Sequence, residues 1–155
     1  MIEIALFQPD IAPNAATIIR MAACFGLKVT IIEPAGFAWT DSSFRRAGLD
    51  YLDRAVVRRC PSWQAFREET QGRRLVLVST KAETPYSEFN FARADIIFMG
   101  QESAGVPQEV HDAAEARILI PMKPGERSLN VSLACAMVTG EALRQTAGFP
   151  NPRAL

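Results

Sequence analysis

The sequence predicts an α/β fold, in which a mostly parallel sheet is covered by helices on both faces. Two observations lead to this fold class. Apolar runs of strand length alternate along the chain with segments of helical pattern, as expected of strand–helix–strand units. The runs RLVLVST (74–80) and DIIFMG (95–100) are almost continuously apolar, which is typical of central strands whose two faces are both covered.

The first half of the chain supplies strands and helices in turn. Apolar and β-branched runs predict strands at 2–7, 28–32 and 55–59. Helices are predicted at about 14–25, 41–51 and 61–71. Asn14 is expected to cap the first of these helices and Gly26 to end it, while Asp41 or Ser42 would cap the second. Pro61 suits the first turn of the third helix.

The second half continues the same alternation. Besides 74–80 and 95–100, it predicts a buried strand at 117–121 and helices at 107–115 and about 129–145. Residues 79–93 have no clear pattern. The last helix begins in RSLNVSLACAM, where polar residues lead into a run that stays uncharged until Glu141. A surface helix shows a polar face, so this helix is expected to be buried on every side.

Length and composition limit the classes of protein that fit. The 155 residues suit a single domain spanning 1–155, without an additional RNA-binding domain. Seventeen basic and seventeen acidic residues cancel, so the whole chain lacks the basic excess common in nucleic-acid-binding proteins. Basic side chains are nevertheless frequent between Arg45 and Lys81.

Three cysteines without a CxxC pair argue against a disulfide framework or a zinc site, and fit a reducing cytoplasm. The first ten residues do not resemble a signal peptide, and the apolar runs fall short of the roughly 20 residues of a membrane span. We therefore expect a cytoplasmic protein that does not act at a membrane.

Three polar loops follow the best-defined strands, where parallel sheets bind their ligands. They are STKAETP (79–85), GQESAGVP (100–107) and PMKPGERSLN (121–130). GQESAG lacks the Lys-Ser/Thr of a nucleotide-triphosphate loop, and the first strand is not followed by GxGxxG. His111 is the single histidine, expected on a helix surface, and neither a metal-ligand cluster nor a GxSxG motif occurs. These exclusions leave group transfer from a ligand held by backbone and apolar contacts.

Three segments share a pattern with one family of RNA-modifying enzymes. They are PNAATIIR (13–20), FMGQESAGVP (98–107) and IPMKPGERSLNVSLACAM (120–137). Shorter likenesses lie at 31–39, 45–51 and 141–150, so the match covers nearly the whole chain. In these segments the chain resembles the SpoU/TrmH branch of the SPOUT RNA methyltransferases. It is similar in particular to the small TrmL type, which methylates the ribose 2'-hydroxyl of the wobble cytidine or uridine of tRNA.

The resemblance implies a C-terminal trefoil knot, a feature otherwise almost absent from proteins. It also implies S-adenosylmethionine as the methyl donor, without a metal, and a homodimer whose site is completed across the interface. The residues that match the family's cofactor contacts are Val78, Gly100, Ile120 and Ser128, with Met122 and Leu129 as neighbours. Glu102 is expected to fix the cofactor loop through Arg20 or Asn130.

For the reaction, the resemblance implies three catalytic residues. Arg20 matches an arginine often proposed as the base, but arginine stays protonated below about pH 12. Arg20 would therefore clamp a phosphate and orient the ribose, with a substrate phosphate taking the proton. Ser128 and Asn130 would hydrogen-bond the ribose and the donor's carboxylate. Arg45 and Arg46 are candidates for contacts to tRNA phosphates.

Four positions depart from the family pattern: Ala16, Thr17, Ala104 and Leu133 stand where Gly, Asn, Arg and Asn are frequent. These departures keep two alternatives open. One is 2'-O-methylation of another tRNA or ribosomal RNA position. The other is a module that binds S-adenosylmethionine or RNA without catalysis.

Overall fold

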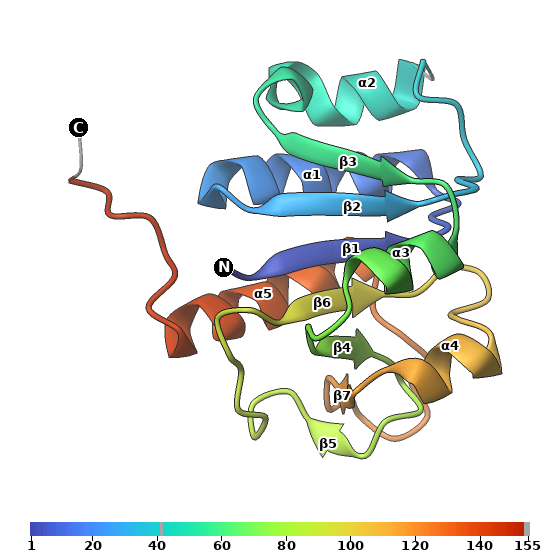
Figure 1. The fold of residues 1–155 in the computed structure, drawn as a ribbon, viewed down its shortest axis with the longest axis vertical. Coiled ribbons are helices and arrows are strands. Elements are labelled where there is room, and N and C mark those ends of the chain that lie inside the picture. The colour runs from blue at the N-terminus through green and yellow to red at the C-terminus, as the bar shows by residue number, and fades with distance from the viewer. Residues whose placement is uncertain (41, 154–155) are drawn as a thin grey trace.

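The computed structural model describes residues 1–40 and 42–153, and their strands form one seven-stranded sheet (Figure 1). Every strand pair is parallel, in the order β3-β2-β1-β6-β4-β7-β5. The strands are β1 Glu3–Phe7, β2 Lys28–Ile32, β3 Val56–Cys60, β4 Leu75–Val78, β5 Thr84–Pro85, β6 Ile96–Met99 and β7 Ala116–Leu119. The predicted fold class and the six predicted strands are confirmed. The short β5 lies in the segment that the sequence left unassigned.

Helices cover both faces of the sheet. They are α1 Ala12–Phe25, α2 Ser42–Gly48, α3 Trp63–Glu69, α4 Gln108–Ala113 and α5 Val131–Gln145, with a 3-10 turn, η1, at Leu49–Asp53. In Figure 1, α1 and α5 lie behind the sheet, and α3 and α4 lie in front of it. Each pair covers its own cluster of buried apolar side chains.

The alternation of side chains along each strand supplies both clusters. In β6, Ile97 and Met99 point to the side of α1 and α5, whereas Ile96 and Phe98 point to the side of α3 and α4. Phe98 stacks on Phe66 of α3, with 5.9 Å between ring centroids. Burying one such side chain contributes about 1.5–3 kcal/mol. The continuous apolar runs therefore reflect a sheet buried on two sides.

Two predicted helix limits are wrong. α1 begins at Ala12 with Ile11 at its N-cap position, so Asn14 lies inside the helix and does not cap it. Pro at the first turn explains the earlier start, because its fixed φ suits that position. The helix predicted at 41–51 ends as α2 at Gly48 and continues as η1; Asp41, one proposed cap, lies outside the described residues. Gly26 ends α1 with a φ of 67°, as predicted.

The expectation that α5 is buried on every side is wrong for the single chain. Cys135, Val138 and Ala142 are buried between α5 and the sheet. On the opposite side of the helix, Leu133 is 59% exposed and Met137 is 42% exposed. The side of α5 that faces away from the sheet is thus exposed and apolar, where a surface helix would carry polar residues.

The strand order brings three ligand loops together. β6 is inserted between β1 and β4, and β7 follows β4 on the other side. The loops after β4, β6 and β7 therefore leave the same edge of the sheet side by side. The starts of α1 and α5 lie at this edge as well, next to the loop after β6 (Figure 1).

Candidate active site

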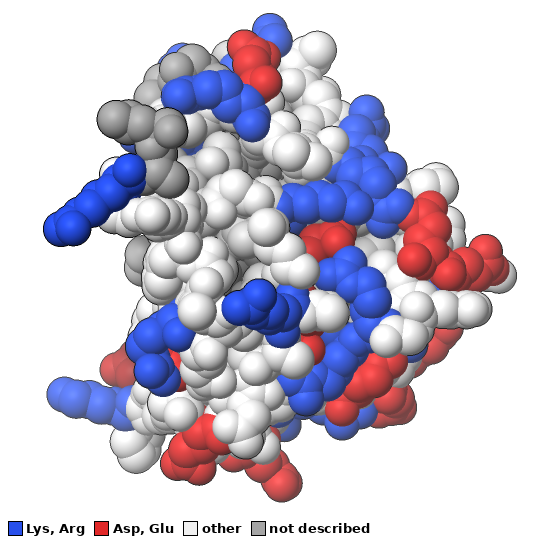
Figure 2. Space-filling view, turned by 60° about the vertical axis from the view of Figure 1, so that its left-hand side comes forward, with Lys and Arg blue, Asp and Glu red and all other residues white. Residues whose placement is uncertain are grey.

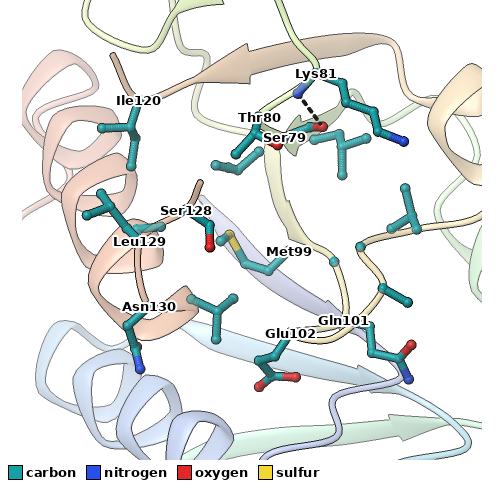
Figure 3. A pocket seen from close by; sticks show the side chains of 18 of the residues that line it. Ser79, Thr80, Lys81, Met99, Gln101, Glu102, Ile120, Ser128, Leu129 and Asn130 are labelled. Carbon is teal, nitrogen blue, oxygen red and sulfur yellow. Dashed lines mark hydrogen bonds between the residues drawn. The ribbon is translucent and has the colours of Figure 1, made fainter. Parts of the chain in front are cut away.

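A cavity of about 510 Å³ opens at the carboxyl ends of β4, β6 and β7 (Figure 3). This volume is within the range of small-molecule and cofactor sites. The structure brings the predicted cofactor residues together around it, along with two of the three predicted catalytic residues. These lining residues are Val78, Gly100, Glu102, Ile120, Met122, Ser128, Leu129 and Asn130.

The cavity has an apolar wall and a few polar groups. Ile120 and Leu129 lie on the side of α5 in Figure 3, and Met99 and Ser128 reach toward the centre. Asn130 and Glu102 stand at one end. An apolar slot with polar groups and exposed backbone at its rim suits a flat heterocycle joined to a polar tail.

The turn after β6 brings backbone close to the cavity. The amide of Gln101 donates to the carbonyl of Gly105 over 2.8 Å, and the amide of Gly105 donates back over 2.8 Å. A Cβ at Gly100 would lie 2.9 Å from the carbonyl carbon of Gly105, so a side chain does not fit there. Gly105 has a φ of 64°, which glycine adopts without strain.

Glu102 fixes this turn through Asp10, not through Arg20 or Asn130 as the sequence suggested. The amide of Asp10 donates to Oε2 of Glu102 over 3.0 Å, and the amide of Glu102 donates to Oδ1 of Asp10 over 3.1 Å. The hydroxyl of Ser103 also donates to Asp10. The loop after β1 and the loop after β6 are thereby held together at the cavity.

The two carboxyl groups titrate as a pair. Burial raises the pKa of Glu102, and its hydrogen bond with Asp10 raises the pKa further. The same hydrogen bond is the largest cause that lowers the pKa of Asp10. Glu102 is therefore the member of the pair that keeps a proton to higher pH.

Asn130 joins the starts of α1 and α5. Its Oδ1 accepts from the amide of Ser132 over 2.9 Å, which caps α5. Its Nδ2 donates to Oδ1 of Asn14 over 3.0 Å. Asn14, a helix cap in the sequence-based prediction, is thus a wall residue of the cavity. Only the tertiary contact reveals this role.

Arg20 does not line the cavity of its own chain. It lies on the exposed side of α1, six residues and about 9 Å of helix rise beyond Asn14. Its guanidinium carbon lies 4.8 Å from the centroid of the Tyr51 ring. Among the residues that the structure describes, Arg20 forms no hydrogen bond or ion pair. One chain alone therefore does not bring Arg20 to Ser128 and Asn130.

Acids neutralise much of the basic segment between Arg45 and Lys81. Ion pairs join Arg58 to Glu69, Arg59 to Glu33, Arg73 to Glu3 and Arg74 to Asp95. On the face shown in Figure 2, basic side chains are spread over uncharged surface with acidic ones beside them. Arg45 and Arg46 are exposed at the end of α2, away from the cavity, and have no acidic partner within the described parts of the chain.

The loop 79–85, which the sequence suggested as a ligand loop, contributes Ser79, Thr80 and Lys81 to the cavity. Sequence reasoning missed Met99, which is the last residue of β6, so the rule that ligands bind at the carboxyl ends of strands could have identified it. His111, expected on a helix surface, also lines the cavity, and its buried ring nitrogens have no hydrogen-bond partner among the described residues. Across residues 1–40 and 42–153, no cluster of three metal-ligating side chains and no helix able to cross a membrane is found.

The chain belongs to the SpoU rRNA Methylase family, whose pattern matches residues 1–140. A tRNA (cytidine(34)-2'-O)-methyltransferase from Ancylobacter novellus is 55% identical, covering 96% of this chain and 95% of that protein. The enzyme of that name from Escherichia coli (strain K12) is 42% identical, with 97% of each chain covered. A solved structure described as "Structural insights into the 2-OH methylation of C/U34 on tRNA" has a TM-score of 0.90 and 36% identity, covering 94% of this chain and 95% of that one.

Proposed function

We propose that this protein transfers a methyl group from S-adenosylmethionine to the ribose 2'-hydroxyl of tRNA, at the wobble cytidine or uridine. The observation that carries the proposal is the match along nearly the whole chain, at 42–55% identity, to enzymes named for cytidine 34. The cavity supports it, because its lining contains all the positions that match the family's cofactor contacts.

The cavity fits S-adenosylmethionine, which supplies an electrophilic methyl group when it is bound. Val78, Ile120 and Leu129 offer an apolar slot for adenine, and Gly100 lets the backbone approach its polar edge. Met122 also lines the cavity. Glu102 holds the turn that carries Gly100, and it does so by its hydrogen bonds to Asp10.

The protein's own residues then position the acceptor. Asn130 and Ser128, at the start of α5, hydrogen-bond the ribose and the carboxylate of the donor. Arg20 remains a cation, because its pKa is above about 12, and clamps a phosphate next to the reacting ribose. A phosphate oxygen of the substrate accepts the proton of the 2'-hydroxyl, so the reaction requires no metal. Arg45 and Arg46 contact phosphates farther along the tRNA.

Three of the four departures from the family pattern lie away from the cavity and replace none of the residues proposed to hold the donor. Ala16 is fully buried, and the Thr17 hydroxyl donates to the carbonyl of Pro13 over 2.8 Å within α1. Leu133 lies on the exposed side of α5. Only Ala104 lines the cavity. Most of these substitutions therefore leave the proposed donor site intact.

A homodimer would complete the site. Ile11 and Leu129 line the cavity and are 45% and 39% exposed, and the apolar surface continues along α5 through Leu133 and Met137. A second copy that covered this stripe would stand at the mouth of the cavity and bring its own Arg20 near Asn130. Such a partner would also explain why α5 has no polar face.

We further propose that residues 1–155 act as a single methyltransferase domain in the cytoplasm, with a trefoil knot in the C-terminal part. The knot is supported by the course of α5, which returns from β7 at the far side of the sheet to pack beside α1. Gln145 of α5 then binds the backbone of Phe89 and Phe91, over 2.9 Å each. The cytoplasm is supported by three free cysteines.

Purified protein incubated with tRNA and labelled S-adenosylmethionine is expected to place the label in a nuclease-resistant, 2'-O-methylated dinucleotide. Mapping by mass spectrometry should assign it to the wobble nucleotide. Label at another tRNA position, or in ribosomal RNA alone, would show that the wobble nucleotide is not the substrate. A folded sample that binds the donor but labels neither RNA would refute the enzymatic function.

Leu133→Glu is expected to produce a monomer that no longer methylates tRNA, because a carboxylate would be buried in the proposed interface. Sedimentation velocity and the methylation assay measure the two effects. Val56→Glu is the matched control: Val56 is 62% exposed, close to the 59% of Leu133, but lies on the edge strand β3. A dimeric, fully active Leu133→Glu variant would contradict the proposed interface.

A further inference from the structure

We propose that Tyr51 positions Arg20 for tRNA methylation by holding its guanidinium against the phenol ring. This inference rests on the proposed function, since Arg20 is the residue assigned there to clamp the substrate. Arg20 belongs to α1 and Tyr51 to η1, elements that pack against each other. The guanidinium carbon of Arg20 lies 4.8 Å from the centroid of the Tyr51 ring, within the distance of a cation–π contact.

The kind of partner distinguishes Arg20 from other arginines of the chain. Arg59 and Arg74 have an aromatic ring within 5.0 and 4.8 Å, but each also binds a carboxylate, Glu33 or Asp95. A carboxylate occupies N–H donors and neutralises the charge. A ring contacts the face of the guanidinium and leaves the N–H groups at its edge available for a phosphate. Arg20 therefore keeps both its charge and its donors.

Tyr51 is itself fixed in place. On one side of it along the chain, Phe44 is buried and stacks on Phe37, with 5.4 Å between centroids. On the other side, Leu52 packs against the core beneath α1. The carbonyl of Tyr51 also accepts from the amides of Arg54 and Ala55, over 3.1 and 2.9 Å. A ring carried by such an anchored turn can hold a long, exposed side chain in one orientation.

A second guanidinium shares the ring, since the Arg54 carbon lies 4.4 Å from the same centroid. The Tyr51 ring thus contacts two guanidinium groups on the surface next to α1. An RNA phosphate is the anion that the Arg20 guanidinium is suited to bind. Residues 45–51 (RRAGLDY) do not line the cavity, but in this proposal they support Arg20 because they include Tyr51.

Tyr51→Leu is expected to lower kcat/KM for tRNA by about 2- to 5-fold, the loss of one cation–π contact at an exposed site. The affinity for S-adenosylmethionine should stay unchanged, because Tyr51 does not line the cavity. Tyr51→Phe, which keeps the ring, should retain the activity of the unmodified protein. Phe89→Leu is the matched control, since it removes a ring 4.8 Å from the Arg74 guanidinium, away from the site.

A double variant separates positioning from a general structural effect. If Tyr51 acts through Arg20, Arg20→Ala with Tyr51→Leu should be no slower than Arg20→Ala alone. Additive losses, or an equal loss in Tyr51→Phe and Tyr51→Leu, would overturn the proposal. Thermal unfolding of each variant identifies any loss that comes from misfolding.

A spectroscopic readout tests the contact without enzymatic activity. In protein labelled with 15N-arginine, the Arg20 Nε–H signal, assigned with Arg20→Lys, should carry a ring-current shift that persists in Tyr51→Phe and disappears in Tyr51→Leu. Absence of that shift would refute the role of Tyr51 even if tRNA is methylated. If the shift is present but the unmodified protein methylates no RNA, the contact stands and the proposed function fails.

Discussion

Arg20→Ala is expected to lower kcat/KM for tRNA methylation by about 100- to 1,000-fold, the loss typical of removing one charge-stabilising donor from an active site. The affinity for S-adenosylmethionine should change little, because Arg20 does not line the cavity. Steady-state kinetics with tRNA and calorimetry with the donor measure the two quantities. Equal losses in both would mean that Arg20 supports the structure and does not act on the substrate.

Arg20→Lys is the conservative comparison. Lysine keeps the positive charge but lacks the planar fork that binds a phosphate in a bidentate manner and stacks on Tyr51. Its activity should lie between those of the alanine variant and the unmodified protein. Full activity with lysine would show that charge alone suffices.

Gly100→Ala is expected to weaken S-adenosylmethionine binding by up to about 100-fold, since steric strain in a packed site costs up to about 3 kcal/mol. The new Cβ would lie 2.9 Å and 3.0 Å from the backbone carbons of Gly105. Backbone cannot rotate away as a side chain does, so the Gln101–Gly105 turn would have to open. Calorimetric titration with the donor measures the effect.

Gly105→Ala is the comparison within the same turn. A Cβ at Gly105 has no atom within 4 Å, but its φ of 64° disfavours alanine by about 1–2 kcal/mol. Binding should therefore fall less than in Gly100→Ala. If both variants bound the donor normally, the turn after β6 would not be part of the donor site.

Arg20→Ala and Gly100→Ala together test which chain of a dimer supplies Arg20 to a given cavity. Arg20→Ala retains an intact donor cavity, and Gly100→Ala retains an intact Arg20. If the site is completed across a dimer, mixed dimers contain one complete site, so mixing the two inactive proteins should restore methylation. If Arg20 served the cavity of its own chain, the mixture would stay inactive.

Local patterns in the sequence predicted most of the secondary structure. Alternation of strand and helix periods located six strands, and the position of Gly26 identified the end of α1. The family resemblance then indicated which residues line the cavity, and the structure gathers them from β4, β6, β7 and α5. Periodicity predicts secondary structure because that structure depends on residues close in the chain. The resemblance indicates lining residues because they lie in continuous sequence motifs.

The sequence by itself therefore determined the α/β class and the loops that line the cavity. Only the tertiary structure decided the pairs that fix its geometry. Asn130 meets Asn14 across 116 residues, and Glu102 meets Asp10 across 92. The first contact exists because α5 packs beside α1, and the second because β6 lies beside β1. Hydrophobic periodicity shows which side chains are buried, but it carries no information about which distant loops the strand order brings together.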